Sequence, residues 1–405
     1  MEAGQKYIYR GENLMLRDIV NYKLVLETLG NVHVGNGEKL STLDYVFDSK
    51  SEKYGLLDPS KWMGFLSDKN FLEEYLKNIE SKGESISNYL WLVGKGVDPW
   101  EIDLYRYIIE NVKVRVKQGE AKKLNDIAGI TKNVEGKPYI PGSSIKGMLR
   151  TALLSVFLYN NKTEYQKEME EITQIIMRDK IEKKELKRVI NTLEKKVFNK
   201  IKSPPEKEIS GQVKDLLRGI IISDSSPESV NMISIKQKLD YGINTKKEPK
   251  SLPIWREVIK PGAFMEFQVG IDRTLIGENQ VFKSIEDILS KLHYFWETII
   301  MPYEKNFAAP LKDVNISTNE SPLVYIGGGV GFHTKSIIYA LSPDGDTARK
   351  LISKYLDFSF KNTRRVPAVD TVVSPRTLKL SEDEQNYVLM GLCRLRVVKN
   401  YAVNG

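Results

Sequence analysis

The most informative segment of the sequence is Tyr139-Ile140-Pro141-Gly142-Ser143-Ser144-Ile145-Lys146-Gly147-Met148-Leu149-Arg150. Its Pro-Gly pair ends whatever element comes before it. Apolar residues then recur with the spacing of one helical face, at Ile145, Met148, Leu149, Ala152, Leu153 and Val156. The spacing predicts a helix that starts just after the Pro-Gly pair, runs to about residue 159 and buries one apolar stripe.

Hydroxyl and cationic side chains gather at the start of this predicted helix. A hydroxyl of Ser143 or Ser144 can accept a backbone N–H and cap the helix. Lys146 and Arg150 lie four residues apart, on a face away from the apolar stripe. Because a helix N-terminus favours anions, these side chains form a candidate phosphate site. An ordinary amphipathic helix with a solvated basic face explains the same residues.

A second candidate site is the glycine run at residues 327–331. Glycine lets the backbone approach a ligand where a Cβ would clash, and successive N–H groups can form an anion nest. Phe332 and His333 could stack on a base, and Lys335 could meet a phosphate. A tight turn between packed elements is the alternative interpretation. The glycines concerned are Gly327, Gly328, Gly329 and Gly331.

Two enzymatic interpretations compete with these binding sites. Residues 329–336 come close to the phosphate-loop pattern, but Thr334 stands where the second glycine belongs. A metal-independent ribonuclease would need a histidine as general base, and His33, in a glycine-rich loop, is the best candidate. It would also need a second acid–base group, and none is spaced close to it in the sequence.

The composition restricts the remaining possibilities. The chain has 405 residues, 41% of them hydrophobic, with a formal charge of +8, so packed cores and a polyanionic partner are both plausible. Its one cysteine, Cys393, excludes an intramolecular disulfide and a cysteine-based zinc site. No signal peptide or long apolar run is evident. We therefore expect a cytoplasmic protein without metal, cofactor or membrane span.

Strand and helix patterns alternate along the chain and predict an α+β protein. Residues 161–208 carry 13 Lys/Arg and 10 Asp/Glu, which predicts long exposed helices inserted into the fold. A further helix is expected over residues 284–301. Period-two or short apolar runs predict strands at 23–29, 112–116, 220–222, 232–239 and 264–272.

Three segments together resemble one known family. They are residues 26–38 (LETLGNVHVGNGE), 140–154 (IPGSSIKGMLRTALL) and 218–226 (RGIIISDSS). They resemble the RAMP proteins of type III CRISPR effector complexes, most of all the fifth Csm subunits of type III-A systems, which cap the 3′ end of the CRISPR RNA (crRNA). The glycine run is similar to the glycine-rich loop of such proteins. One departure is Asn31, where the family usually has a proline.

The resemblance implies a ferredoxin-like, RRM-type RAMP core over residues 1–275, with insertions at about 48–125 and 161–210. A second α+β region with the glycine-rich loop would cover residues 276–405. It also implies a non-catalytic, antiviral crRNA-binding subunit that supports crRNA 3′ maturation. Its partners would be crRNA, target RNA indirectly, cellular nucleases and other Csm subunits, chiefly the neighbouring backbone subunit.

By the same resemblance, Ser143, Ser144, Lys146 and Arg150 would contact the crRNA backbone. The glycines of the 327–331 run and Lys335 would line the same path. Two alternatives remain open at this point: a RAMP endoribonuclease that processes crRNA with His33, and a pure protein scaffold.

Overall fold

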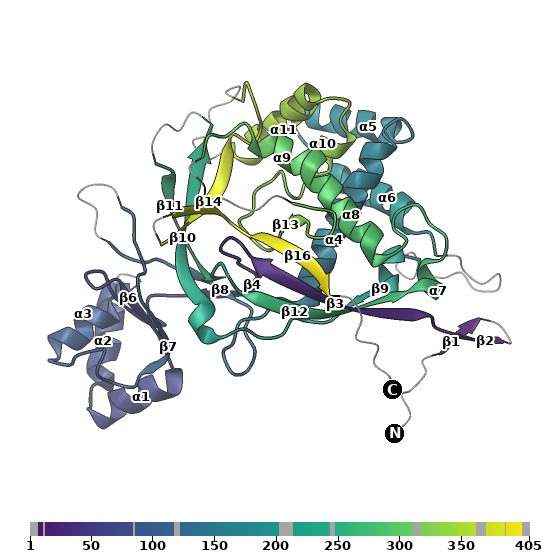
Figure 1. Ribbon diagram of the computed structural model, residues 1–405. Coiled ribbons are helices and arrows are strands. Elements are labelled where there is room, and N and C mark those ends of the chain that lie inside the picture. The colour runs from purple at the N-terminus through teal and green to yellow at the C-terminus, as the bar shows by residue number, and fades with distance from the viewer. Residues whose placement is uncertain are drawn as a thin grey trace.

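The computed structural model (Figure 1) describes residues 7–10, 13–83, 86–116, 122–201, 214–243, 248–309, 311, 317–361, 370–384 and 386–398. It mixes helices with strands in several sheets, which confirms the predicted α+β class. Two large sheets form the body of the protein.

The first large sheet is antiparallel, with strand order β13-β16-β3-β12-β9. Its main strands and two of the helices between them follow the chain order β3, α4, β9, β12, α8, β16. The elements are β3 (Ile19–Thr28), α4 (Gly142–Asn160), β9 (Ile220–Ile222), β12 (Phe264–Asp272), α8 (Ile285–Phe295), β13 (Leu323–Tyr325) and β16 (Leu392–Val398).

Side-chain alternation explains how this sheet buries one face. Along β12, Met265, Phe267 and Val269 are buried, whereas Phe264 and the two polar residues that alternate with them are exposed. The buried set belongs to the same core as Ile145, Leu149, Ala152 and Leu153 of α4. The prediction of a single buried stripe holds only for the first half of the helix, because residues 152–158 are all buried. Helix α4 also packs against α8.

The second large sheet has strand order β15-β14-β10-β11-β8-β4, in which only β11 and β8 run parallel. Its strands are β4 (Gly35–Leu40), β8 (Ile127–Ile130), β10 (Ile233–Gly242), β11 (Lys250–Ile259), β14 (Thr377–Asp383) and β15 (Asn386–Leu389). The chain passes from this sheet to the first one through the short connections β11–β12 and β15–β16. Strands from both sides of residue 275 therefore share each sheet.

The predicted insertion at about 48–125 contains a small unit that Figure 1 shows beside the two sheets. It has its own sheet, ordered β5-β6-β7, and its own aromatic-rich core around Trp62, Trp91 and Tyr105. Its elements are β5 (Tyr45–Asp48), β6 (Lys53–Leu57), α1 (Pro59–Asp68), α2 (Leu72–Lys82), α3 (Asn88–Gly94) and β7 (Tyr105–Ile109).

The charged segment is helical, as predicted, but the expectation that its helices are exposed is wrong. Helix α5 (Gln166–Met177) and helix α6 (Lys183–Phe198) each bury one apolar stripe. Ile175, Ile176 and Leu193 are fully buried in the main core. Charged residues cover only the outer faces, which is the pattern of an amphipathic helix rather than of a solvated one.

The strand predicted at 112–116 is also absent. Val112 and Val114 are buried, so the alternation marked an inward and an outward side correctly. Nevertheless, none of the described strands pairs with this segment; the Arg115 N–H instead donates to the side-chain oxygen of Gln237 at 3.1 Å. The remaining elements are β1 (Tyr7–Arg10), β2 (Asn13–Leu16), α7 (Arg273–Ile276), α9 (Met301–Glu304), α10 (Ile338–Leu341) and α11 (Gly345–Ser359).

Candidate nucleic-acid interface

The start of α4 is fixed by contact with the end of β9. The Gly142 N–H donates to Asp224 Oδ1 at 2.9 Å. A Cβ at Gly142 would lie 2.5 Å from the carbonyl oxygens of Ile222 and Ser223, closer than any real contact, so only glycine fits. The Ser225 N–H donates to the Ile140 carbonyl oxygen, and the Ile140 N–H donates to the Ser225 hydroxyl, both at 3.0 Å. Two of the three segments that carry the family resemblance therefore lie against each other.

The prediction that a serine caps α4 is wrong. The helix begins at Gly142 with Pro141 as the N-cap, and no side chain of the cap residue accepts a hydrogen bond. Ser143 and Ser144 lie inside the first turn, the first exposed and the second partly so. The carboxylate of Asp224 instead binds the helix end, which is the role that an anion would otherwise take.

Lys146 and Arg150 both bind atoms of the chain itself. The ammonium group of Lys146 donates to the Ile220 carbonyl oxygen at 2.8 Å, and burial lowers its pKa. The guanidinium of Arg150 pairs with Asp215 and lies 3.6 Å from a Glu194 oxygen. These contacts support the junction of α4 with β9 and α6, and RNA contact by the two cations stays a prediction.

The glycine-rich loop packs directly on the loop that holds His33. Gly327, Gly329 and Gly331 all have positive φ, at 86°, 82° and 104°, which favours glycine. The Gly328 N–H donates to the His33 carbonyl oxygen at 2.7 Å. A Cβ at Gly327 would lie 2.1 Å from that same oxygen, so the glycines here permit a close approach between two loops.

The histidines beside this loop are packed rather than free. His333 is buried, stacks on Tyr303 at 4.1 Å between ring centroids, and its Nε2 lies 3.2 Å from Glu304. The expectation that it stacks on a base is therefore wrong. His33 is only 6% exposed; its Nδ1 lies 2.8 Å from the Glu257 carbonyl oxygen, and burial lowers its pKa.

One groove brings several of the predicted site residues together. We call it the glycine-loop groove, a cavity of about 410 Å³ between the His33 loop, α4 and the glycine-rich loop. Of the predicted contacts, Ser144, Gly327, Gly328 and Lys335 line it, whereas Ser143, Lys146, Arg150, Gly329 and Gly331 do not. The full lining is Val34, Gly35, Ser144, Gly147, Met148, Thr151, Tyr325, Gly327, Gly328, Thr334 and Lys335.

Three kinds of group in the groove could bind a ligand: side-chain hydroxyls, the backbone of the glycines and one cationic side chain. Lys335 donates from Nζ to the carbonyl oxygen of Gly327, on the same wall of the groove, at 2.9 Å. Burial lowers the pKa of this lysine. A phosphate in the groove would give the ammonium group a stronger acceptor than a neutral carbonyl.

Sequence reasoning missed Arg256, which lies under the glycine-rich loop. Its Nη1 is buried and has no hydrogen-bond partner among the described residues, and it lies 3.1 Å from where a Cβ of Gly329 would be. Burial lowers its pKa. No local motif marks this arginine, because only the fold brings β11 beneath the loop.

The described residues contain no group of His, Cys, Asp or Glu that could hold a metal ion. None of the helices within the described ranges is both long enough and apolar enough to span a bilayer.

Comparison with known proteins shows the family of this chain. The sequence profile of the RAMP superfamily matches residues 25–336. The chain belongs to the RAMP superfamily. The match extends from β3 to the glycine-rich loop, so this RAMP protein carries every wall of the groove within the matched region.

Csm5 proteins of three species are similar to this chain over most of its length. The RAMP chain is 25% identical to Csm5 of Streptococcus thermophilus over 327 residues, 80% of this chain and 82% of that protein. It is 24% identical to Csm5 of Mycobacterium tuberculosis over 93% of this chain and 97% of that one. It is 23% identical to Csm5 of Enterococcus italicus over 92% of this chain and 96% of that protein.

Solved structures show the same fold. A chain in the Csm–crRNA–target RNA ternary complex of a type III-A CRISPR-Cas system aligns with a TM-score of 0.61 at 17% identity, over 94% of this chain and all of that one. The crystal structure of Csm5 from T. onnurineus aligns with a TM-score of 0.56 at 19% identity, over 91% and 99% of the two chains.

Proposed function

We propose that this RAMP protein is the Csm5-type subunit of a cytoplasmic type III-A CRISPR complex, and that it binds crRNA in the glycine-loop groove. Within the complex it would cap the 3′ end of the crRNA and support crRNA 3′ maturation. The observation that carries the proposal is the meeting of Ser144, Gly327, Gly328 and Lys335 in one groove, although they come from segments far apart in the chain. The similarity to Csm5 proteins over nearly their whole length supports the assignment.

The lining of the groove suits an RNA backbone rather than particular bases. Hydroxyls, backbone groups and an ammonium recognise phosphate and sugar and carry little sequence information. His333, which could have stacked on a base, is buried against Tyr303. A guide RNA varies in sequence, so a site of this kind fits its recognition.

The proposal is tested by anisotropy titration of a labelled crRNA with the full chain, as wild type and as Lys335→Gln. Loss of one phosphate contact should weaken binding and make the slope of log K against log salt shallower by about 0.7. Lys69→Gln, an exposed lysine outside the groove, is the matched control and should change neither quantity. Equal crRNA affinity of wild type and Lys335→Gln would show that the RNA does not bind in the groove.

The face of α4 is tested separately with the double variant Lys146→Ala/Arg150→Ala. Both side chains bind the chain itself, so we expect the variant to lower the unfolding midpoint more than it lowers RNA affinity. Weaker RNA binding at an unchanged midpoint would place the RNA on this face of α4 instead.

The chief competing function is metal-independent cleavage of precursor crRNA by His33. The burial of this histidine between glycine positions favours a packing role. Incubation of the purified chain with labelled precursor, in chelator and with added metal, separates the two functions. Specific cleavage that His33→Ala abolishes would replace the binding proposal with an endoribonuclease.

A further inference from the structure

A second cavity lies beside the glycine-loop groove. It encloses about 220 Å³ between helices α4, α5, α6 and α11 and the segment that follows the glycine-rich loop. Thr151 and Lys335 line both cavities, so the two meet at these residues. We call the second cavity the side pocket.

Apolar and aromatic side chains form most of the side pocket, eight of its thirteen lining residues. Leu154 and Ile172 are buried, whereas Ile190, Phe332 and Tyr355 are only partly buried, so a ligand can reach them. The rings of Phe332 and Tyr355 lie 5.9 Å apart between centroids and are tilted by 33°. A flat ligand with an apolar face would remove these side chains from water, which is favourable.

The charges that line the side pocket disfavour an anion inside it. Arg150 is compensated by carboxylates, because its guanidinium pairs with Asp215 and lies 3.6 Å from a Glu194 oxygen. A phosphate in the side pocket would face the Glu194 carboxylate, and like charges repel. Lys335, at the border, directs its ammonium group to Gly327, a residue of the groove. An anionic group is therefore favoured in the groove and a neutral group in the side pocket.

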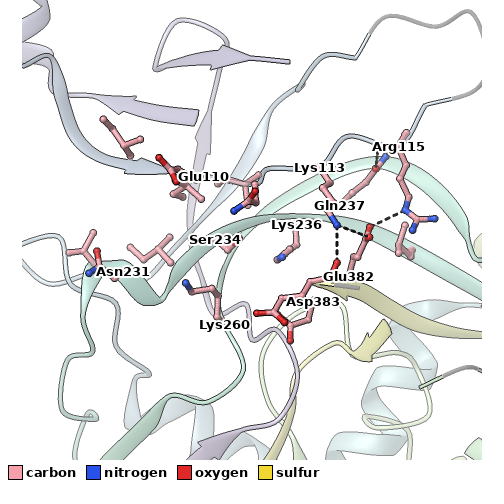
Figure 2. Close-up of a pocket in the computed structure, with 18 residues that line it drawn as sticks. Glu110, Lys113, Arg115, Asn231, Ser234, Lys236, Gln237, Lys260, Glu382 and Asp383 are labelled. Atoms are coloured by element: carbon pink, nitrogen blue, oxygen red, sulfur yellow. Dashed lines mark hydrogen bonds and ion pairs between the residues drawn. The ribbon is translucent and has the colours of Figure 1, made fainter. Parts of the chain in front are cut away.

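A larger cavity beside β10 is a poorer continuation of the groove (Figure 2). It encloses about 500 Å³ and shares no lining residue with the groove. Lys113 and Arg115 line it, but they lie 3.5 and 3.0 Å from oxygens of Glu382. Glu110 and Glu384 add further carboxylates to the lining. These carboxylates would repel an RNA strand, so the side pocket is the better neighbour for RNA in the groove.

We propose that the side pocket receives one base of the crRNA strand whose backbone lies in the glycine-loop groove. The inference rests on the proposed function, because it names the part of the RNA that enters the adjoining cavity. A nucleotide joins a neutral, flat base to an anionic phosphate, and the two cavities suit these two parts. Sites for drug-sized ligands enclose about 300–1,000 Å³, so this smaller pocket suits a single base. Stacking on aromatic rings accepts any base, as a variable guide requires.

The test is anisotropy titration of the full chain with a series of labelled crRNAs, each with one abasic site. Loss of the stacked base should weaken binding at least about fivefold at one position, and the neighbouring positions should show a much smaller effect. Any of the four bases at that position should restore the affinity. A series without a sensitive position overturns the proposal, and this part of the test needs no protein variant.

A double variant, Phe332→Leu/Tyr355→Leu, locates the sensitive base. Leucine keeps both positions apolar but removes the rings, so intact and abasic RNA should bind this variant with equal affinity. Phe360→Leu is the matched control, because it removes an exposed ring outside the side pocket, and the abasic penalty should persist in it. An undiminished penalty in the double variant overturns the proposal. If urea unfolding shows that the double variant is unfolded, each single substitution should lower the penalty instead.

Lys335→Gln in the same titrations separates this inference from the proposed function. If Lys335→Gln weakens binding but no abasic site does, the backbone lies in the groove and the inference alone fails. If Lys335→Gln binds like wild type and an abasic penalty still depends on the two rings, the side pocket holds a base and the proposed binding in the groove fails.

Discussion

Glu257 carries a buried charge where β7, β8 and β11 meet. Its side chain is fully buried and lies 2.7 Å from the ammonium of Lys132. It also accepts hydrogen bonds from the Ile130 N–H at 3.0 Å and from the Tyr107 hydroxyl. Three donors therefore satisfy this carboxylate. Its removal would leave Lys132, which is only 15% exposed, without its counter-charge.

We predict that Glu257→Gln lowers the free energy of unfolding by about 3 kcal/mol, because it leaves Lys132 as an uncompensated buried charge. Glu266→Gln is the matched control. Its pair with Lys23 is short at 2.6 Å but largely exposed, so its loss should cost less than about 1 kcal/mol. Urea unfolding measures both, and similar losses would show that burial of the pair has no effect.

The packed imidazole of His33 makes a pH-dependent prediction. Burial lowers the pKa of His33 in the folded chain, so the unfolded chain binds the proton more readily. Stability must then fall as the pH drops below the unfolded value of about 6.5. Unfolding midpoints at pH 7.5 and 5.5 should differ more in wild type than in His33→Gln. An equal difference in the two proteins would show that His33 is exposed enough to titrate normally.

At the scale of single residues, the sequence predicted part of the candidate site. The glycine run at 327–331 and Lys335 just after it identified one wall of the groove, because these residues lie close together in the sequence. The partner of Arg150 is 65 residues away at Asp215, and the group that binds the α4 N-terminus is 82 residues away at Asp224. No helical spacing or capping rule contains those contacts, which is why the serines were wrongly expected to cap α4.

Helix α4 gives a sharper test at the scale of one element, since two of its glycines have opposite surroundings. A Cβ at Gly142 would meet two β9 carbonyl oxygens, whereas nothing lies within 4 Å of one at Gly147. Gly142→Ala should therefore cost about 1–3 kcal/mol by overpacking, and Gly147→Ala should add about 1 kcal/mol through helix propensity. Thermal unfolding distinguishes the two, and a tolerated Gly142→Ala would mean that α4 does not start against β9.

The elements that the sequence predicted well are those whose pattern is decided by one buried face. Strand β12 shows the expected period, although Phe264 lies on its exposed face. Helix α4 buries five of the six expected residues, but its residues 152–158 are all buried, so its second half buries more than the one predicted stripe. The alternation at 112–116 also marks a buried side, yet a strand needs a partner, and here Gln237 binds the backbone at Arg115. Side-chain periodicity reports burial, and it cannot report whether another strand is within reach.

At the largest scale, a strand from early in the sequence and one from late in it pair inside the first sheet. Strand β16 pairs with β3 along most of its length, with Leu395 opposite Leu26. The main core therefore depends on a contact between residues about 370 positions apart in the sequence. Forming such a contact costs chain entropy and slows folding. The insertion around Trp62 is different, because its core uses only residues 46–105.

Because the two cores are separate, we predict that a Leu→Ala substitution in each core raises hydrogen exchange in a different part of the chain. Leu395 and Leu66 are both buried, and each Leu→Ala variant should lose about 2–5 kcal/mol locally. Leu395→Ala should raise hydrogen exchange across β3 and α4, because β16 completes their core. Leu66→Ala should raise exchange only within residues 45–109, because its contacts stay inside the insertion core. Exchange that spreads equally from both sites would show that the insertion and the sheets unfold as one unit.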